Sequence, residues 1–310
     1  MFVGLDIGGT KTAVLVVDQA LNARSRYVAR TDVSEPYKLM EGVVAAINCA
    51  LEIANVAPDQ ILAIGAGLPG RVFPETGEVA MAVNLNLDLF PFGKVLSSAF
   101  GVPVLLENDV RTAALGSFEW QLKQEVIDHM AYLSIGTGIS AGLVLNGRLY
   151  RGASGMAGEI GHVVFAPKGP LCPCGASGCL EAVASGPAIA RDWQDANQVS
   201  FNAPVTAKDV YEAADRGEPT ALSVVRRTSQ FLARAIQLLI MLYDVEKVVL
   251  GGGVTGAGPS FLDPVLSALS HIREESSLAQ EMLPENKVAM LSSGSDAPTW
   301  GAINLALQAI

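Results

Sequence analysis

The sequence is poor in basic residues and in long apolar runs. Lysine and arginine number 21 against 31 aspartate and glutamate, a net charge of −10. Because nucleic acids and anionic membrane surfaces attract basic footprints, this balance argues against both as partners. The densest apolar run, Leu238–Tyr243, is six residues long, whereas a membrane-spanning helix needs roughly 18. The first residues, Met1–Asp6, include no basic segment, so we expect no secretory signal and a cytoplasmic protein.

The chain does have the length and the apolar content for sizeable cores. Of its 310 residues, 50% are apolar and 17% are charged, which excludes a disordered chain. At roughly 150 residues per domain, this length suggests two domains. Strand-like runs alternate with helical patterns, which is typical of an α/β architecture. The strand-like runs are 2–7, 12–18, 61–65 and 102–106, and the helical patterns are 37–57, 110–120 and 300–310.

An internal repeat indicates that one half of the chain is a divergent copy of the other. Leu5–Val16 aligns without gaps on Leu133–Val144, and Ile64–Gly70 aligns on Leu250–Gly256. Both pairs occur in the same order, which chance matching of single segments does not explain. The boundary between the copies is expected near residues 118–131. Two similar domains that face each other would form an interdomain cleft, the usual place for a ligand.

The two glycine hairpins within this repeat are typical of phosphate binding. A turn without Cβ atoms lets backbone N–H groups approach phosphate oxygens, whereas a single such turn is also explained by a tight hairpin without a ligand. Asp6, at the end of the first strand, is a candidate ligand of a phosphate-bound Mg²⁺. Lys11 either reaches a phosphate or is a solvated surface lysine. The predicted phosphate-binding residues are Gly8, Gly9, Thr10, Gly136, Thr137 and Gly138.

A histidine and three closely spaced cysteines predict a metal site. Three thiolates and an imidazole complete a tetrahedral Zn²⁺ shell with no open position, so the site is expected to be structural. The alternatives are a disulfide or inert thiols, but Cys172 and Cys174 are too close in sequence for an easy bridge. Cys49 lies alone in an apolar helical pattern and is predicted to be a core residue. The predicted ligands are His162, Cys172, Cys174 and Cys179.

Three carboxylates are candidates for binding or proton transfer. Asp109 follows a strand and precedes a helix, so it is suited either to accept a proton from an alcohol or to cap that helix. Glu159 and Glu181 bracket the predicted zinc ligands. The metal would hold them as rigid hydrogen-bond acceptors for a polyhydroxylated ligand. The alternative is that both are surface glutamates beside a structural loop.

These motifs together resemble the ROK family of sugar kinases (repressor, open reading frame, kinase), which belongs to the actin/hexokinase-like superfamily. Among its members the bacterial ROK glucokinases are the most similar. The resemblance covers essentially the whole chain, and the cysteine block followed by Leu180-Glu181 is its most specific part. The motifs that carry it are Asp6–Lys11, Gly65–Gly70, Glu107–Asp109, Gly136–Gly138, Gly158–His162, Cys172–Glu181 and Gly251–Gly253.

The resemblance implies a duplicated, ribonuclease H-like α/β fold of two domains. The last helix would return to the first domain, so residues 1–118 and 293–310 would form a smaller domain. Residues 119–292 would form a larger one that carries the zinc loop, the segment from His162 to Cys179. The resemblance also implies a homodimer that acts on a hexose and a nucleotide, with ATP, Mg²⁺ and a structural Zn²⁺ as cofactors.

The resemblance further implies a role for each candidate residue. Asp109 would be the general base, and the other sugar-binding residues would be Gly67, Asn84, Asn108, Glu159, His162 and Glu181. His162 would bind zinc through one ring nitrogen and face a sugar hydroxyl with the other. Phosphates would be held by Gly8, Thr10, Lys11, Thr137 and Gly138, and adenosine by the loop of Gly251, Gly252 and Gly253.

The expected activity is ATP-dependent phosphorylation of a hexose, with the 6-hydroxyl of glucose as the first choice of acceptor. One alternative is an N-acetylmannosamine or N-acetylglucosamine kinase, because these specificities share the residues named above. A second is a non-catalytic ROK-type sugar-sensing regulator. The sequence lacks the N-terminal DNA-binding arm of such regulators, which counts against it. A third, an unrelated zinc-stabilised interaction module, leaves the paired hairpins unexplained.

Overall fold

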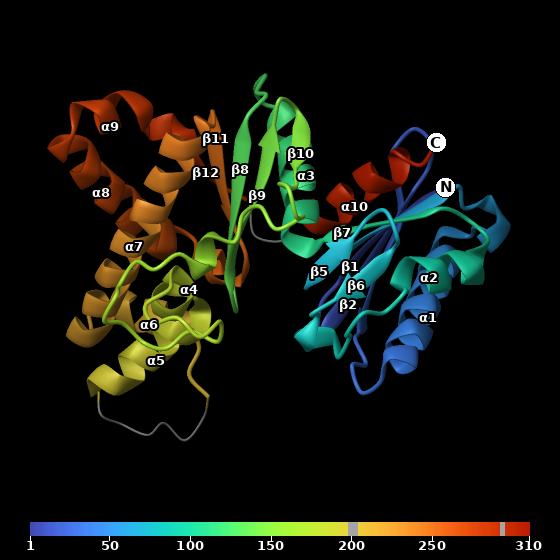
Figure 1. Cartoon of the computed structure of the whole chain (residues 1–310), viewed down its shortest axis with the longest axis horizontal. Coiled ribbons are helices and arrows are strands. Elements are labelled where there is room, and N and C mark those ends of the chain that lie inside the picture. The colour runs from blue at the N-terminus through green and yellow to red at the C-terminus, as the bar shows by residue number, and fades with distance from the viewer. Residues whose placement is uncertain (198–203, 292–294) are drawn as a thin grey trace. The chain divides into compact units, whose positions relative to one another are not determined.

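The computed structural model describes residues 1–197, 204–291 and 295–310, which form two compact units (Figure 1). Unit 1 comprises Met1–Val126, Leu149–Ala157 and Asp296–Ile310, and unit 2 comprises Ile127–Arg148 and Gly158–Ser295. The expected boundary at 118–119 falls inside a helix, and residues 149–157 pack with unit 1 rather than with the second domain. The other expected boundary, at 292–293, lies outside the described residues.

Unit 1 is built on a sheet with the strand order β3-β2-β1-β4-β7. Strands β1, β2 and β3 run antiparallel, whereas β4 and β7 extend the sheet in parallel from β1. The strands are β1 (Phe2–Ile7), β2 (Lys11–Val17), β3 (Ala23–Arg30), β4 (Ala63–Leu68) and β7 (Val104–Asn108). Strand β3 has no counterpart among the sequence predictions, and β4 continues three residues beyond the predicted end at Gly65.

Helices cover both faces of this sheet, which explains why β1 is an almost continuous apolar run. Successive strand residues point to opposite faces. Val3 and Leu5 therefore join the core formed with α1 (Pro36–Ala54), and Phe2 joins Ile303 of α10 (Ala297–Leu307) on the other side (Figure 1). The remaining elements of the unit are η1 (Pro58–Gln60), β5 (Arg71–Phe73), β6 (Glu78–Ala80), η2 (Val83–Leu85), α2 (Phe92–Phe100) and α3 (Asp109–Leu122).

Unit 2 contains a second sheet, with the strand order β10-β9-β8-β11-β12. The 25-residue helix α7 (Pro219–Tyr243) contributes many of the side chains of its core. The strands are β8 (Met130–Ile135), β9 (Ile139–Leu145), β10 (Arg148–Tyr150), β11 (Lys247–Gly251) and β12 (Val288–Met290). The other helices are η3 (Ile160–His162), α4 (Leu180–Ala184), α5 (Gly186–Asn197), α6 (Ala207–Asp215), η4 (Gly253–Ala257), α8 (Pro259–Glu275), α9 (Ser277–Met282) and η5 (Glu285–Lys287).

The two sheets share one topology, which confirms the duplicated α/β fold. Each has an antiparallel glycine hairpin at its centre, extended on one side by two parallel strands. The gap-free alignment of the hairpins is wrong by one residue, however. Ile7 pairs with Thr12 across four intervening residues, whereas Ile135 pairs with Ile139 across three. The second turn is therefore one residue shorter, and from Ile139 onward the repeat is shifted by one position.

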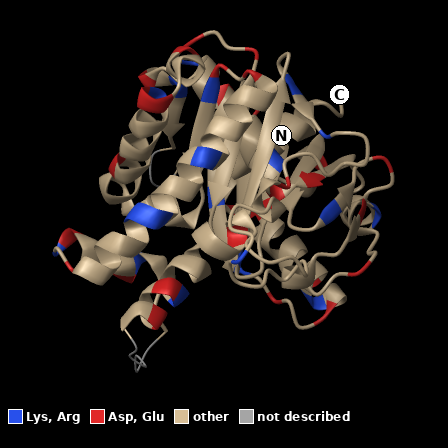
Figure 2. Cartoon of the chain, turned by 60° about the vertical axis from the view of Figure 1, so that its left-hand side comes forward, with Lys and Arg blue, Asp and Glu red and all other residues tan. Residues whose placement is uncertain are grey.

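Charge does not single out a particular surface of this fold. Acidic and basic residues are interspersed along helices and loops (Figure 2). Among the residues that the structure describes, no helix combines the length and the apolar character needed to cross a lipid bilayer.

Cys49, predicted to be a core residue, is only half-buried on α1, and its thiol is a hydrogen-bond partner of the Tyr27 hydroxyl.

Candidate functional site

In unit 1, the predicted residues gather where parallel strands end. Asp6 near the end of β1 pairs in register with Gly67 on β4, and Gly67 pairs with Glu107 on β7. The carboxyl ends of parallel strands are the usual ligand edge of an α/β sheet. A Cβ at Gly67 would lie 3.0 Å from the side chain of Thr112 on α3. Asp6 and Asp109 lie near enough for the charge of Asp109 to affect the titration of Asp6.

The neighbouring residue, Asn108, bears on whether Asp109 serves to cap the helix or to accept a proton. Asn108 occupies the N-cap of α3, and its side-chain oxygen accepts hydrogen bonds from the amides of Val110 at 3.0 Å and Arg111 at 3.3 Å. Asp109 is the first helical residue, and its Oδ1 accepts from the amide of Val110 at 2.9 Å. Because Asn108 caps the helix, capping alone does not require a carboxylate at position 109.

Burial perturbs the titration of both aspartates. It raises the pKa of Asp6 to about 6, helped by the negative charge of Asp109 and opposed by Lys11. Burial also raises the pKa of Asp109, an effect that a hydrogen bond from the amide of Val110 partly offsets. Two carboxylates with raised pKa values at one sheet edge are typical of a functional site rather than of a stabilising ion pair.

Asp6 should therefore destabilise the folded protein at neutral pH. Its folded pKa, about 6, lies above the ordinary value of 3.8, so the native state binds more protons between these pH values and stability falls as pH rises through them. We expect Asp6→Asn to raise the free energy of unfolding at pH 7 by on the order of 2 kcal/mol. The gain should vanish below about pH 4. Urea unfolding across this pH range, without Mg²⁺ or nucleotide, measures it.

Asp18→Asn is the matched control, with the opposite expected sign. The Asp18 carboxylate is partly exposed, and the amide of Asn22 holds its pKa below the ordinary value. Neutralising Asp18 should therefore lower stability at pH 7, because its charged form is the one that the fold favours. Equal effects of the two substitutions would contradict the assignment of a buried, unfavourable charge to Asp6.

The first glycine turn is open where a ligand would approach. A Cβ at Gly8 would meet nothing closer than the carbonyl oxygen of Lys11 at 3.6 Å, and the backbone there is not left-handed. Packing and conformation therefore do not explain that glycine, whereas close approach of a phosphate does. Gly9 lies against Asn84, whose backbone oxygen would be 2.7 Å from an added Cβ. The structure thus brings Asn84 to this turn, and the side chain of Lys11 is exposed beside it.

The corresponding turn in unit 2 has the same character. A Cβ at Gly136 would have the amide of Gly253 as its nearest neighbour, at 3.7 Å, so this position also has room for a ligand. Gly253 belongs to the predicted adenosine loop, which follows β11 and leads into η4. The structure therefore places the second glycine turn and the Gly251–Gly253 loop side by side within unit 2.

Glu181 and the backbone before Glu159, which flank the zinc loop on either side, both contact the second glycine hairpin. The carboxylate of Glu181 accepts a hydrogen bond from the amide of Ile139 at 3.0 Å, and a Cβ at Gly138 would lie 2.5 Å from it. Gly158 has a φ of +98°, and a Cβ there would clash with the carbonyl oxygen of Ala141 on β9. The glycine thus lets the backbone before Glu159 lie directly on that strand. Sequence spacing did not reveal this tie between the loop and the hairpin.

The four predicted zinc ligands converge. One ligand atom from each of His162, Cys172, Cys174 and Cys179 lies within 4.8 Å of all the others. The Nδ1 atom of His162 is 3.6 Å from the sulfur of Cys172, whereas Nε2 points to Glu159, 4.0 Å from its carboxylate. Nδ1 is therefore the ring nitrogen that faces the thiols. All four cysteines of the chain are free thiols, so the disulfide alternative is wrong.

The chemistry of this donor set fits Zn²⁺. A shell of three sulfurs and one imidazole nitrogen is that of a closed structural site. In the absence of metal, hydrogen bonding led by the amide of Ala176 lowers the pKa of Cys174 to about 7, whereas burial raises the pKa of Cys179 to about 12. Coordination of zinc by Cys179 must therefore displace a proton, so zinc affinity should weaken as pH falls.

One feature next to the candidate base was missed by the sequence analysis. Glu107 is completely buried, and its carboxylate pairs with Arg111 at 2.7 Å and with Arg151 at 2.6 Å. The signal available in the sequence was a glutamate at the end of an apolar strand, followed four residues later by arginine. That spacing indicates a helical ion pair, but it does not indicate that Arg151, 44 residues away, completes the cluster.

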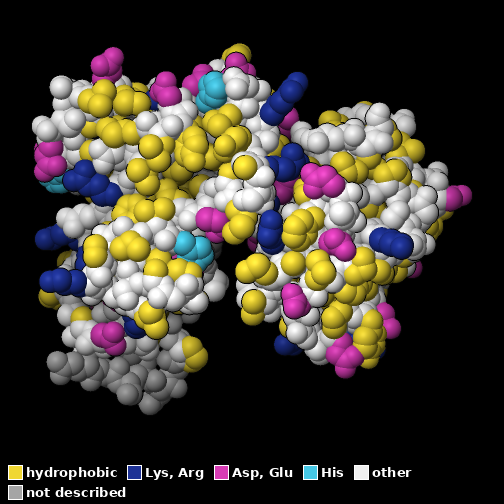
Figure 3. All heavy atoms as spheres, viewed as in Figure 1, with side chains coloured by type: hydrophobic (Ala, Val, Ile, Leu, Met, Phe, Trp, Pro, Cys, Tyr) yellow, Lys and Arg dark blue, Asp and Glu magenta, His cyan; other side chains and the backbone are white. Residues whose placement is uncertain are grey.

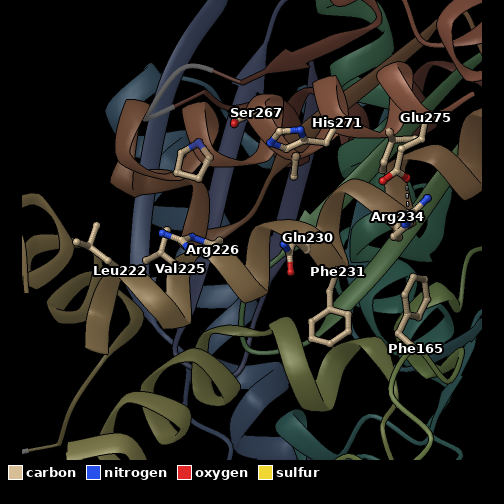
Figure 4. A pocket seen from close by; sticks show the side chains of 13 residues that line it. Phe165, Leu222, Val225, Arg226, Gln230, Phe231, Arg234, Ser267, His271 and Glu275 are labelled. Carbon is tan, nitrogen blue, oxygen red and sulfur yellow. Dashed lines mark ion pairs between the residues drawn. The ribbon is translucent and has the colours of Figure 1, made fainter. Parts of the chain in front are cut away.

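A cavity of about 680 Å³ lies elsewhere in unit 2, between α7 and α8 (Figure 4). Its lining includes Phe231 and Arg234 of α7, His271 and Glu275 of α8, and Phe165 from the zinc loop. Hydrophobic side chains are also exposed on the surface of unit 2 that includes α7 (Figure 3). None of the predicted site residues lines this cavity, so its size alone does not mark the candidate site.

Comparison with known proteins bears on both units. The model described as the ROK family matches residues 2–309. A glucokinase from Halalkalibacterium halodurans is 35% identical over 85% of this chain and 83% of its own. An N-acetylmannosamine kinase from Yersinia pestis is 33% identical over 85% of this chain and 86% of its own. The crystal structure of a ROK family glucokinase from Streptomyces griseus, in complex with glucose and AMPPNP, has a TM-score of 0.79, 31% identity and 99% coverage of both chains.

Proposed function

Because the chain belongs to the ROK family, we propose that it transfers the terminal phosphoryl group of ATP to a hexose, with the 6-hydroxyl of glucose as acceptor. The observation that carries this proposal is the partly buried sheet edge of unit 1. There Asp109 has a raised pKa, and Asn108 caps the following helix in its place. Such a carboxylate is suited to accept a proton from an alcohol during phosphoryl transfer.

In the proposed reaction, the ionised carboxylate of Asp109 accepts the proton of the sugar hydroxyl as its oxygen forms a bond to the γ-phosphorus. The bond between that phosphorus and the bridging oxygen breaks, and ADP leaves with the electron pair. The backbone amides of the glycine turns would hold the phosphates. Asp6 would hold Mg²⁺, which would supply positive charge to the phosphate oxygens. Because its pKa is raised, Asp109 is a stronger base than an exposed aspartate and is better suited to accept a proton.

Sugar recognition is proposed to use polar side chains that are held by other parts of the fold. The carboxylate of Glu181 accepts a hydrogen bond from the amide of Ile139, and Nδ1 of His162 lies 3.6 Å from the sulfur of Cys172. Rigid acceptors favour a ligand that offers a hydroxyl to each, because any ligand without one leaves a polar group unpaired. Asn108 donates from Nδ2 to the carbonyl oxygen of Gly70 at 3.3 Å, and its side chain also hydrogen-bonds the Asp109 carboxylate. These roles are part of the proposal.

A panel of sugars tests the proposed function. We expect ADP release, measured with a coupled assay, to depend on added hexose and to have its highest kcat/KM with glucose among glucose, mannose, fructose, N-acetylglucosamine and N-acetylmannosamine. The N-acetylmannosamine kinase from Yersinia pestis is nearly as similar to this chain as the glucokinase is. An acetamido sugar as the preferred acceptor is therefore the second candidate.

The outcomes of this panel distinguish a glucose kinase from an acetamido-sugar kinase and from a non-catalytic sugar sensor. Activity with an acetamido sugar and none with glucose would overturn the choice of acceptor and leave the kinase class intact. Sugar binding by calorimetry without any sugar-dependent ADP release would favour a non-catalytic sugar sensor. Absence of both sugar binding and ATP binding would contradict the kinase proposal altogether.

A further inference from the structure

A cluster of charged side chains in unit 1, formed by Glu107, Arg111 and Arg151, is centred two residues before the candidate base Asp109. One oxygen of the Glu107 carboxylate accepts hydrogen bonds from Nε of Arg111 at 2.7 Å and from the amide of Asn108 at 2.9 Å. The other oxygen accepts from Nε of Arg151 at 2.6 Å. A fully buried carboxylate is tolerated only when it is well paired. Glu107 therefore specifies where the Asn108 backbone and both arginines lie.

Arg151 fastens an unusual segment of the chain to this cluster. Residues Leu149–Ala157, here called the strap, belong to unit 1, although they begin within β10 and the residues before and after them belong to unit 2. Arg151 attaches the strap to Glu107, and Arg111 attaches it a second time by donating from Nη1 to the carbonyl oxygen of Gly155 at 2.7 Å. One carboxylate thus organises both the start of α3 and the strap.

The strap leads without interruption into the proposed sugar-binding residues of unit 2. Its last residue, Ala157, is followed by Gly158 and Glu159. The strap is therefore only two peptide bonds from Glu159. On the other side of the cluster, Glu107 accepts a hydrogen bond from the backbone amide of Asn108, the residue before Asp109. The cluster therefore touches the backbone supports of two groups proposed to act on the same sugar.

We propose that Glu107 and Arg151 are positioning residues for phosphoryl transfer. Glu107 holds the junction that carries Asn108 and Asp109, and Arg151 ties the strap that carries Glu159 to the same carboxylate. This inference rests on the proposed function. Both oxygens of Glu107 are engaged within the protein, so it acts through its neighbours rather than on the substrate.

Arg151 offers a cleaner test than Glu107. Its side chain is 39% exposed, and after its removal Glu107 remains paired with Arg111, so the variant is expected to fold. We expect Arg151→Met to raise the sugar KM and lower kcat by about tenfold each, with the KM for ATP changed by less than about twofold. Arg151→Lys should recover part of the loss, since it restores the charge without the planar guanidinium. Steady-state kinetics with each substrate varied in turn measures the split.

Arg148→Met is the matched control, because Arg148 is exposed on β10, three residues before Arg151, and outside both the cluster and the strap. Its kinetics should equal those of the wild type. A purely structural role for Arg151 would lower the fraction of folded protein and leave both KM values unchanged. Equal kinetics for Arg151→Met and Arg148→Met would overturn the inference.

A double-mutant cycle with Glu159→Gln tests the proposed route through the strap. If Arg151 acts by placing Glu159, the two substitutions should be non-additive in their effect on sugar affinity. Additive effects would overturn that route. Calorimetry with the sugar and hydrogen exchange of the strap amides provide readouts that need no turnover. A wild-type protein that binds sugar but releases no ADP would contradict the proposed function, whereas strap amides equally protected in both arginine variants would contradict this inference.

Discussion

Asp109→Asn is expected to lower kcat by about a thousandfold and to leave the dissociation constant of the sugar within about threefold. An asparagine keeps the shape of the side chain and an oxygen for the amide of Val110, which Asp109 contacts at 2.9 Å. It cannot accept a proton from the attacking hydroxyl. The loss should therefore fall on the chemical step rather than on binding. Single-turnover kinetics and calorimetry with the sugar measure the two quantities separately.

The fold should survive this substitution. Asn108 caps α3, and burial already disfavours the charged form of Asp109, so the neutral variant should unfold at the wild-type temperature or higher. Asp59→Asn is a suitable control, because Asp59 also stands in the first turn of a helix in unit 1 but is exposed and outside the site. Near-normal turnover by Asp109→Asn would remove Asp109 from the role of general base.

Loss of zinc is the second change with a large expected effect. We expect the purified protein to contain about one zinc ion per chain, and Cys179→Ser to abolish that content and reduce kcat/KM at least about a hundredfold. Cys179 is fully buried and directly precedes α4, the helix that carries Glu181. Without the metal, the loop no longer fixes the ring of His162 or the start of that helix. Metal analysis and sugar-dependent kinetics check the two parts.

The control for this prediction is Cys49→Ser, the same chemical change at the cysteine outside the cluster. A hydroxyl there can still interact with Tyr27, and zinc content and activity should both be retained. Wild-type protein stripped of metal by a chelator should lose activity and regain it when zinc is added back. Full activity and an unchanged melting temperature in the stripped protein would contradict a structural zinc site.

Several features were predictable because the interactions that produce them are local. The glycine hairpins lie at the expected residues because an antiparallel pair with a short glycine turn needs only neighbouring sequence. The convergence of Cys172, Cys174 and Cys179 was also predictable, since the ligands are seven residues apart or less and a short loop brings them together. Apolar runs revealed β1 and β4 as buried strands.

Two predictions, the alignment of the hairpins and the end of β4, were inaccurate. In both cases the spacing of residues along the sequence does not show how strands pair or what packs against them. A one-residue difference in the second hairpin turn leaves the apolar pattern of the aligned segments almost unchanged, so the gap-free match looked satisfactory. Strand β4 was predicted to end at Gly65, where a glycine-rich segment begins. In the structure, α10 packs so closely against Gly65 that a Cβ would clash with Ala302, and the strand continues beyond it. That reason is contributed by residues more than 200 positions away.

The amino-acid sequence by itself determined the duplicated α/β plan, the glycine turns and the four-residue metal cluster, because each depends on residues that are close along the chain or repeated in it. Only the tertiary structure decided which residue caps α3, which aspartates have raised pKa values, and that Glu107 and Arg151 form a buried pair. Those properties depend on burial and on partners from distant segments. Sequence spacing does not reveal them, because a folded chain sets burial through all of its contacts at once.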